Sequence, residues 1–412
     1  MRLPLLTPAP TTPARAARAR AARALPPSAL AAAVVLAGAL VATAAAAPVA
    51  AAAAAASTHR SRAVCTKPRP GFAHCDAVLR LDPRTGLPQR TAAPAGLSPA
   101  DIEGAYGLPS GGGAGRLVAI VDAYDDPHAE ADLASYRATF GLPACTRASG
   151  CLQISGQDGA PGLPAANPSW SEEISLDLDA VSAACPGCRI ALVEATTSSL
   201  TDLGAAVRTA AALPGVVAIS NSYGGAISAG AARLAATWSA PGAWVVASSG
   251  DGGYGVEVPA ALPSVVAVGG TTLTLSGHAR RRETAWSGSG SGCSTLAKPA
   301  WQRTRSCAGR AVADVAADAD PATGLAVYDT VGSAGGWLQV GGTSLAAPLV
   351  AGVHAQAGSA SADARALYAP DAAVADVTSG RDGTCTPKVL CTAGAGWDGP
   401  TGVGSPDGLA GW

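Results

Sequence analysis

The chain has 412 residues, a formal net charge of −1 and 48% hydrophobic residues, of which few are aromatic. This length allows one large α/β domain or two small ones, with a core built mainly from Val, Leu, Ile and Ala. The chain has no excess of basic residues over acidic ones, so nucleic acid is not an expected partner.

Residues 1–56 are predicted to be a secretory signal peptide followed by an Ala-rich segment. Five arginines precede an apolar stretch over residues 30–46, and a run of alanines with many Ala-x-Ala sites comes next. This order of charged, apolar and small residues is typical of a secretory signal. A membrane anchor is the alternative, but the stretch is Ala-rich and short for a span of about 20 apolar residues. We therefore expect a secreted protein with no stable membrane association.

The next segment, residues 57–96, is polar and Pro-rich, and it is too short to be an independent folded domain. The ten cysteines of the chain fall into five close pairs: Cys65/Cys75, Cys145/Cys151, Cys185/Cys188, Cys293/Cys307 and Cys385/Cys391. After a secretory signal, local pairs in an even total predict disulfides. A zinc site at the third pair is the weaker interpretation, because no second C-x-x-C or nearby histidine completes it.

Residues 97–412 are predicted to form one α/β domain, which begins with a helix capped by Ser98 and Pro99. Apolar runs predict strands over residues 117–122, 189–194, 216–222, 243–249 and 265–269. Helices are predicted over residues 128–139, 171–184, 199–212, 228–239 and 344–357. Alternation of such strands with helices predicts a mostly parallel sheet covered by helices on both faces.

Polar side chains lie at the ends of three of these strands. Asp122, residues 221–224 and residues 248–251 each come directly after an apolar run. Because sites in such sheets form at the carboxyl ends of strands, we expect these residues to line one cleft. A catalytic cleft and a peptide-binding cleft would both show this pattern.

Ser344 is the candidate nucleophile. Residues 341–348 read Gly-Gly-Thr-Ser-Leu-Ala-Ala-Pro, so the serine lies on a turn that opens a predicted helix. There its amide, at the positive end of the helix dipole, can help to hold an oxyanion. An ordinary helix cap after a Gly-Gly turn is the alternative.

The general base is more difficult to find. The histidines are His59, His74, His128, His278 and His354. Of these, only His128, six residues after Asp122, is kept as a reserve candidate for a Ser-His-Asp site.

A carboxylate pair is the preferred base. Glu173 and Asp177 are spaced i, i+4, so a helix places both on one face, where they can share a proton and accept the proton of Ser344. The alternation of Ile174, Leu176 and Leu178 also permits a strand, but the following alanines favour a helix. An acidic solvent-facing helix is the alternative.

Asp251 is the candidate electrophile. Within Ser-Gly-Asp-Gly, a protonated Asp251 in a dry cleft can donate a hydrogen bond to the oxyanion. A simple Gly-Asp-Gly turn is the alternative.

Seven motifs succeed one another along the chain: Glu173-x-x-x-Asp177, Ser248-Ser249-Gly250-Asp251, Pro259-Ala260-Ala261, Ala267-Val268-Gly269-Gly270-Thr271, Glu283-Thr284-Ala285-Trp286, Lys298-Pro299-Ala300-Trp301-Gln302 and Gly342-Thr343-Ser344. In these motifs and their order, residues 97–412 resemble the sedolisin family of serine-carboxyl peptidases. The resemblance implies a subtilisin-like three-layer fold. It also implies that Ser344 is the nucleophile, Glu173 the base, Asp177 its partner and Asp251 the oxyanion donor.

The same resemblance implies two binding sites. Ser222, Tyr223 and Gly224 would edge the cleft and pair with substrate backbone as an added strand. One Ca²⁺ ion would be bound near the C-terminus by five residues, through carboxylates and backbone carbonyls: Asp376, Val377, Gly394, Gly396 and Asp398. A plain Gly-rich turn is the alternative to the calcium site.

The sequence as a whole predicts a secreted, monomeric serine-carboxyl endopeptidase that acts on peptides or proteins in acid. Two other hypotheses stay open. One is a subtilisin-type Ser-His-Asp peptidase, and the other is a secreted, non-catalytic relative that only binds peptides in the cleft.

Overall fold

The computed structural model describes residues 60–228, 230–331, 335–358 and 363–412. The predicted signal peptide and His59 lie outside these residues. The described residues from 60 onward belong to one compact unit, so residues 60–96 are part of the same body as the predicted peptidase domain. In the described part of the chain, no helix is both long and apolar enough to cross a membrane.

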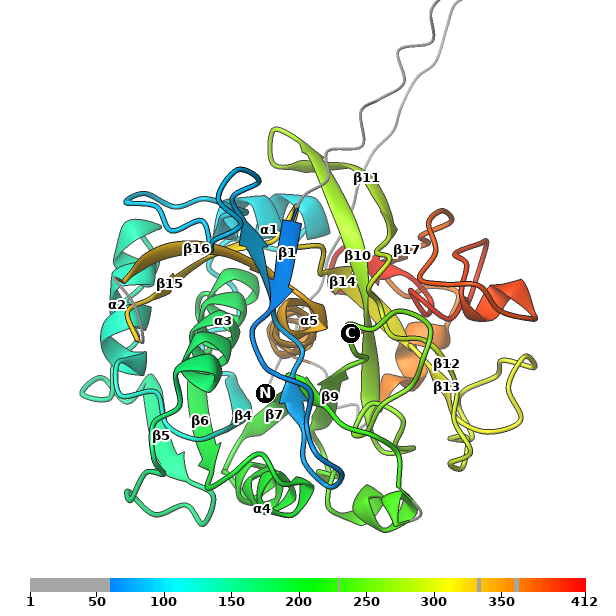
Figure 1. The fold of residues 1–412 in the computed structure, drawn as a ribbon, viewed down its shortest axis with the longest axis horizontal. Helices are drawn as coiled ribbons and strands as arrows, with labels where there is room; N and C mark the ends of the chain where they lie inside the picture. Colours follow the sequence, from blue (N-terminus) through cyan, green and yellow to red (C-terminus); the bar gives the residue numbers. More distant parts are fainter. Residues whose placement is uncertain (1–59, 229, 332–334, 359–362) are drawn as a thin grey trace, which may run out of the picture. The chain divides into compact units, whose positions relative to one another are not determined.

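An eight-stranded, mostly parallel sheet forms the centre of the fold (Figure 1). Its main path runs in the order β11-β10-β9-β7-β4-β6-β5, and β14 pairs with β10. The bounds are β4 Leu117–Ala123, β5 Leu152–Gly156, β6 Arg189–Ala195, β7 Val216–Asn221, β9 Trp244–Ser248, β10 Val266–Ser276, β11 Ala279–Ala285 and β14 Val315–Asp318. All five predicted strands are therefore confirmed. The sequence missed β5, β11 and β14, of which β11 is a half-exposed antiparallel strand with three consecutive arginines.

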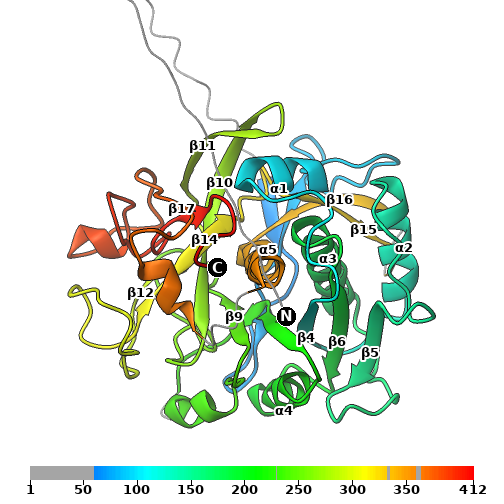
Figure 2. The ribbon, with the colours of Figure 1, turned by 180° about the vertical axis from the view of Figure 1, so that it is seen from behind.

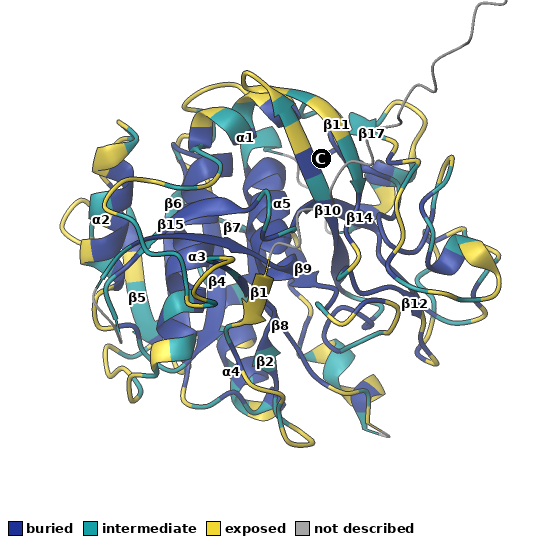
Figure 3. Cartoon of the chain, turned by 45° about the horizontal axis from the view of Figure 1, so that its top comes forward, coloured by how far each residue is buried: buried dark blue, intermediate teal, exposed yellow. Residues whose placement is uncertain are grey.

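Helices cover both faces of this sheet, as the alternating pattern predicted. They are α1 Pro99–Tyr106, α2 Ala129–Thr139, α3 Pro168–Ala184, α4 Leu200–Ala211 and α5 Thr343–Ala357. In Figure 2, α3 and α5 lie beside each other over the sheet, and α4 lies apart from them. α3 joins β5 to β6, and α4 joins β6 to β7 in the same direction across the sheet, so two right-handed crossovers would put both helices on one face. Because α3 and α4 lie on opposite faces, one of these two connections departs from the usual hand. The layers make α3, α5 and the central strands almost wholly buried (Figure 3).

The helix predicted over residues 228–239 is wrong. Only a 3₁₀ segment forms there, η1 Ala231–Ala236. Gly230 precedes it, and Pro241 and Gly242 come shortly after it, which leaves too few residues for a stable α-helix. Trp238 instead inserts fully into the core, where it fixes the loop.

The N-terminal residues add strands that the sequence analysis did not predict. A four-stranded antiparallel sheet has the order β1-β3-β16-β15, with β1 Arg60–Ala63, β3 Val78–Leu81, β15 Leu325–Asp329 and β16 Gly336–Gly341. A second small pair joins β2 His74–Cys75 to β8 Tyr223–Gly224. Residues 60–81 are therefore bound by backbone pairing to two parts of the peptidase that are distant in sequence.

All five local cysteine pairs form disulfides, as predicted. The Cys145–Cys151 and Cys185–Cys188 disulfides lie just before the neighbouring strands β5 and β6, where Cys151 Sγ is 3.6 Å from the carbonyl oxygen of Cys188. Because both sulfurs of the Cys185–Cys188 pair are used in a disulfide, the zinc interpretation of this pair is wrong. These two disulfides constrain the starts of two paired strands of the central sheet.

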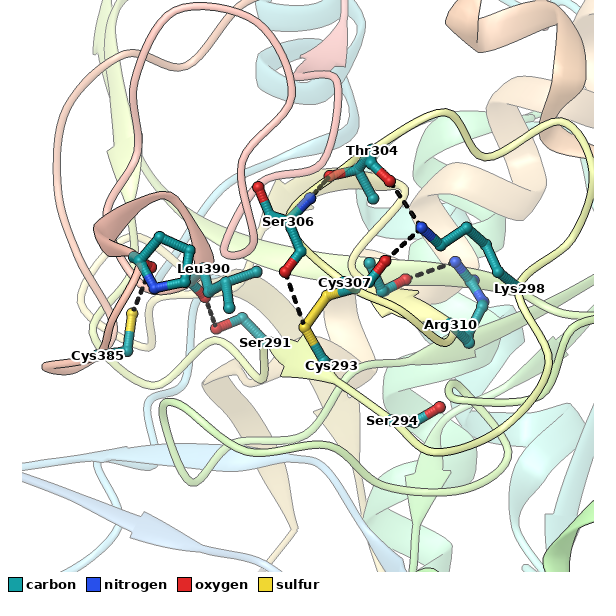
Figure 4. Close-up of a disulfide and its surroundings, with 12 residues drawn as sticks. Ser291, Cys293, Ser294, Lys298, Thr304, Ser306, Cys307, Arg310, Cys385 and Leu390 are labelled. Carbon is teal, nitrogen blue, oxygen red and sulfur yellow. Dashed lines mark hydrogen bonds between the residues drawn. A yellow bond between two sulfur atoms is a disulfide. The ribbon is translucent and has the colours of Figure 1, made fainter.

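Two further disulfides hold loops of the C-terminal half. Figure 4 shows the Cys293–Cys307 loop beside the loop closed by Cys385–Cys391. The Ser291 hydroxyl donates to Leu390 O at 2.7 Å, and Lys298 closes its own loop on Thr304 O at 2.6 Å. The two loops thus attach the C-terminal region to the core.

The remaining elements of the described chain are short. They are β12 Gly292–Cys293, β13 Ala311–Val312, η2 Ala364–Tyr368, β17 Val374–Ala375, η3 Lys388–Leu390 and β18 Ser405–Pro406.

Candidate active site

Ser344 is the second residue of α5 and is fully buried. Gly342 precedes the helix with φ 93°, a left-handed conformation that favours glycine. This turn leaves the Ser344 amide without an intrahelical partner, and the amide donates to the carbonyl oxygen of Asp76 at 2.9 Å. The nucleophile therefore lies beside a backbone donor that already holds a peptide carbonyl.

Glu173 and Asp177 lie on α3, which packs against α5. The helix forms because Asn167 caps it, accepting from the amides of Ser169 and Trp170 at 3.1 and 3.3 Å, with Pro168 at its first position. Both carboxyls are fully buried. The predicted helix is confirmed, and the strand and the solvent-facing helix are wrong.

Burial raises the pKa of Glu173 well above its usual value, and the neighbouring Asp177 and Asp122 raise it further. The pKa of Asp177 is likewise raised well above its usual value, by burial and then by Asp122. No hydrogen bond joins the two carboxyls in the structure, and both raised pKa values favour the protonated forms.

Asp122 is a third acid of this cluster. It is fully buried at the end of β4, where burial raises its pKa to about 8. The sequence placed Asp122 at the cleft, but only as the partner of a histidine. The electrostatic effect of Asp122 on Glu173 and Asp177 puts it with the carboxyl pair instead.

A hydrogen-bond chain joins the serine to this cluster. The Ser222 hydroxyl donates to Asp177 Oδ2 at 2.8 Å, and the Ser344 hydroxyl donates to Ser222 O at 3.0 Å. The Ser344 hydroxyl also lies close enough to Glu173 to lower its pKa in part. A rotation of this hydroxyl would direct its proton at the Glu173 carboxylate, so the base and the nucleophile are in reach of each other.

Asp251 comes shortly after β9 and lies against the start of α5. Its Oδ1 accepts from the Thr343 amide at 2.7 Å and from the Thr343 hydroxyl at 3.0 Å. Burial raises the pKa of Asp251 well above its usual value, and Asp76 raises it further. A Cβ at Gly342 would lie 2.7 Å from Asp251 Oδ2 and would collide with Asp76 O. The carboxyl thus faces the same small space as the Ser344 amide.

None of the four histidines in the described ranges forms a hydrogen bond with Ser344. His128 is exposed and contacts the Thr330 hydroxyl at 2.7 Å, and His278 contacts Asp101. His354 stacks on Trp244 in the core, where burial lowers its pKa to about 3. His74 lies 3.5 Å from Asp76. The reserve pairing of Asp122 with His128 therefore has no geometric support.

The cleft edge predicted at Ser222, Tyr223 and Gly224 is occupied by the chain itself. β8 pairs with β2, matching Gly224 with His74 and Tyr223 with Cys75, and the Asp76 amide donates to Ser222 O at 3.3 Å. Sequence reasoning missed Asp76. No local pattern marks this residue, because its position depends on pairing with strands far away in the sequence.

The residues predicted to hold calcium lie together near the C-terminus. Gly396 donates its amide to Asp376 Oδ2 at 2.8 Å, and Gly394 donates to Asp398 Oδ2 at 2.9 Å. Val377 is buried beside Asp376.

The surroundings of the two carboxyls decide whether this loop suits a cation. Asp398 is fully buried, and no arginine, lysine or histidine of the described residues forms an ion pair with either carboxyl. Burial, together with the neighbouring Asp376, raises the pKa of Asp398 to about 7. Carboxylates without a basic partner suit Ca²⁺, but the groups that contact them in the structure are donors: the amides of Gly394, Gly396 and Thr401 and the Thr401 hydroxyl.

Comparison with known proteins agrees with this geometry. The Subtilase family matches residues 162–377. Kumamolisin of Bacillus sp. (strain MN-32) is 33% identical over 364 residues, which cover 78% of this chain and 64% of that protein. Sedolisin of Pseudomonas sp. (strain 101) is 35% identical over 212 residues, which cover 42% of this chain and 35% of that protein. This chain thus spans less than two thirds of the length of these relatives.

The fold has a similar counterpart among solved structures. The structure of Pseudomonas sedolisin, a serine-carboxyl proteinase complexed with two molecules of pseudo-iodotyrostatin, superposes with a TM-score of 0.65 at 28% sequence identity. The superposition covers 76% of this chain and 96% of that chain. Its span includes most of the described residues, and the subtilisin-like three-layer fold is therefore shared.

Proposed function

Because this chain belongs to the sedolisin family of subtilisin-like serine-carboxyl peptidases, we propose that it is an endopeptidase that hydrolyses peptide bonds through an acyl-enzyme on Ser344. Its substrates are peptides or proteins bound as an extended strand along Ser222, Tyr223 and Gly224.

In the proposed reaction, the Ser344 hydroxyl attacks the scissile carbonyl carbon while its proton passes to Glu173. Asp177 shares the proton of the pair and holds Glu173 in place, and Asp122 keeps the cluster partly protonated. The oxyanion accepts hydrogen bonds from the Ser344 amide and from the protonated Asp251. Glu173 then gives its proton to the leaving amine, and water releases the acid product by the reverse steps.

One observation carries this proposal. The Ser344 amide donates at 2.9 Å to a peptide carbonyl, Asp76 O, which lies over Gly342 together with Asp251 Oδ2. A carbonyl that accepts from the Ser344 amide and lies beside Asp251 has the position in which an oxyanion would be stabilised.

Two further parts of the proposal concern the environment of the enzyme. We place the protein outside the cell, because its five disulfides need an oxidising compartment and its N-terminus has the layout of a secretory signal. We also propose that it is a monomer. We also propose one Ca²⁺ ion between Asp376 and Asp398, with the carbonyls of Val377, Gly394 and Gly396 as further ligands. Its role would be to stabilise the C-terminal loop rather than to react.

The test is hydrolysis of a denatured protein and of a quenched fluorescent peptide library, measured from about pH 3 to pH 8. We expect the wild type to cleave internal bonds and the Ser344→Ala variant to be inactive. Unchanged cleavage by Ser344→Ala would remove Ser344 from the reaction. A folded wild type that binds peptides but cleaves none at any pH would identify a non-catalytic binder.

A further inference from the structure

Three side chains that can bind a metal ion meet beside β8. His74, Asp76 and Glu257 each offer one ring nitrogen or carboxylate oxygen, and these three atoms lie within 4.8 Å of one another. In the part of the chain that the structure describes, no other three such side chains gather this closely. None of the three is among the residues proposed for catalysis or for calcium.

Backbone pairing explains why the three side chains meet. His74 and Asp76 are two residues apart on extended chain, so their side chains project from the same face. Gly224 lies directly opposite His74, and opposite residues of an antiparallel pair also share a face. A Cβ at Gly224 would collide with Glu257 Oε2. The Glu257 carboxyl therefore fills the space that a side chain at position 224 would occupy, beside His74 and Asp76.

The chain holds these residues in place on both sides. The pairing of β2 with β8 fixes His74, and the Cys65–Cys75 disulfide anchors the residue between His74 and Asp76. On the other side, Val258 and Gly225 exchange two backbone hydrogen bonds, at 3.0 and 2.9 Å, immediately after Glu257. The three side chains thus project from backbone that is already ordered, as a metal site requires.

The polar atoms of this cluster lack partners. Asp76 is 1% exposed, and its Oδ1 lies 3.5 Å from His74 Nε2. Among the described residues, no arginine or lysine forms an ion pair with Asp76 or Glu257. Asp76 Oδ1, Glu257 Oε2 and His74 Nδ1 are buried atoms that form no hydrogen bond within the described chain. Because buried polar atoms are normally satisfied, these three atoms point to a ligand between them.

The kinds of ligand atom indicate which ion fits. One imidazole nitrogen and two carboxylate oxygens are ligands of Zn²⁺, which often takes three protein groups and a water molecule. Ca²⁺ and Mg²⁺ prefer oxygen ligands alone. The ligand atoms of tetrahedral Zn²⁺ lie about 3.3 Å apart, so the 3.5 Å between His74 and Asp76 already suits this ion. A small rotation of the flexible Glu257 side chain completes the set.

Ser248 orients one of these ligands. Its hydroxyl, fully buried at the end of β9, donates to Asp76 Oδ2 at 2.6 Å. This bond leaves Asp76 Oδ1 on the side of His74. Donors that fix the unused oxygen of a carboxylate are typical of metal sites.

The site is also open to solvent on one side. The His74 side chain is 20% exposed. It lines a surface cavity of about 460 Å³, which Trp170 and Ser198 also border. An ion can therefore enter without unfolding of the chain.

From this arrangement we propose that His74, Asp76 and Glu257 bind one Zn²⁺ ion, with water in the fourth position. The ion joins β2 to the loop that follows β9, two parts of the chain that no disulfide links. The inference goes beyond the proposed function and does not depend on the role of Ser344.

The experiment is calorimetric titration of the full-length Ser344→Ala chain with ZnCl₂ at about pH 7.5, where the ligands of a metal site can lose their protons. Excess Ca²⁺ is present throughout, so that the proposed C-terminal site is already filled. We expect one Zn²⁺ ion per chain and a rise in melting temperature, because the ion binds the native state. Co²⁺ in place of Zn²⁺ should give the visible absorption of a four-coordinate ion.

Two variants locate the ion. His74→Ala and Glu257→Gln should each weaken Zn²⁺ binding at least tenfold and remove the rise in melting temperature. The matched control is His128→Ala, which changes an exposed histidine that contacts Thr330 and should bind Zn²⁺ like the parent. Near-UV circular dichroism of each variant checks that the fold is kept.

A folded parent chain that binds no Zn²⁺ would overturn the inference. So would Zn²⁺ binding that both variants retain in full, because the ion would then lie elsewhere. Either result leaves the proposed function intact, since peptide hydrolysis tests that function separately.

Discussion

Thr343 donates both its amide and its hydroxyl to one oxygen of Asp251, Oδ1, at 2.7 and 3.0 Å. The two donors fix the carboxyl through Oδ1 and leave Oδ2 facing the proposed oxyanion position. Thr343 is adjacent to the nucleophile, so a single turn of chain positions both Ser344 and the group that would stabilise the product of its attack.

The first prediction concerns this carboxyl. Asp251→Ala removes the proposed donor, and kcat should fall by about 10²- to 10³-fold. Asp251→Asn should lose less, because an amide can still accept from Thr343 and donate to the oxyanion. Steady-state kinetics on a peptide substrate give the comparison. Equal, small losses in both variants would mean that Asp251 does not contact the oxyanion.

The second prediction is the shape of the pH profile. Burial raises the pKa of Asp251 well above its usual value, so the carboxyl keeps its proton through the acid range. Activity should therefore fall as pH rises through the raised pKa of Asp251, while loss of one proton from the Glu173 and Asp177 pair sets the acid side of the profile. In Asp251→Asn, the alkaline fall should move to higher pH, since an amide does not ionise. A histidine base would give the opposite profile, with activity appearing above about pH 6.5.

The third prediction concerns the base on α3. Glu173→Gln removes the proton acceptor, and kcat/KM should fall by about 10²- to 10⁴-fold. The matched control is Glu172→Gln on the same helix, because Glu172 interacts with Asp329 and Arg90 rather than with the serine. Kinetic constants and thermal melting of both variants should be compared. A comparable loss in the control would point to helix disruption instead of a missing base.

The fourth prediction is that the protein is more stable in acid. Asp122 and Glu194 are paired in register on β4 and β6, and burial raises their pKa values to about 8 and about 9. Between the unfolded pKa of about 4 and these folded values, the native state binds more protons than the unfolded state. The free energy of unfolding must therefore fall as pH rises across this window.

Urea unfolding of Ser344→Ala at several pH values from about 4 to 8 measures this slope without self-digestion. Adding Glu194→Gln removes one of the buried acids and should flatten the slope, whereas Asp371→Asn, an exposed acid, should leave it unchanged. Stability that increases with pH in the parent would contradict the prediction.

The fifth prediction concerns calcium. A ligand that binds only the native state raises its stability, so a chelator should lower the melting temperature of the wild type, and added Ca²⁺ should restore it. Asp398→Ala should abolish this response, while Asp371→Ala, an exposed acid shortly before the loop, should retain it. Elemental analysis of the purified protein provides a second measure. No metal and no chelator effect would leave a Gly-rich turn as the right interpretation.

The sequence by itself determined the features that depend on local spacing. The strands that end near Asp122 and Ser248 and the helix that carries Glu173 and Asp177 follow from the spacing of apolar residues. The short disulfide loops follow from cysteines that lie close together in the sequence. Each was predicted at nearly its final bounds, because the pattern of apolar and polar residues along a strand or helix indicates which side chains are buried.

Only the tertiary structure showed that the chain's own N-terminal residues lie in the cleft. β3 pairs with β16 and β2 pairs with β8 across long stretches of chain, and these pairings alone bring Asp76 to Ser344. The role of Asp122 as a third acid beside Glu173 was likewise visible only once β4 and α3 were placed together. The sequence of a strand of two to four residues does not identify the strand with which it pairs, because every residue offers the same backbone hydrogen bonds. The packing of the whole fold decides which strand edge it joins.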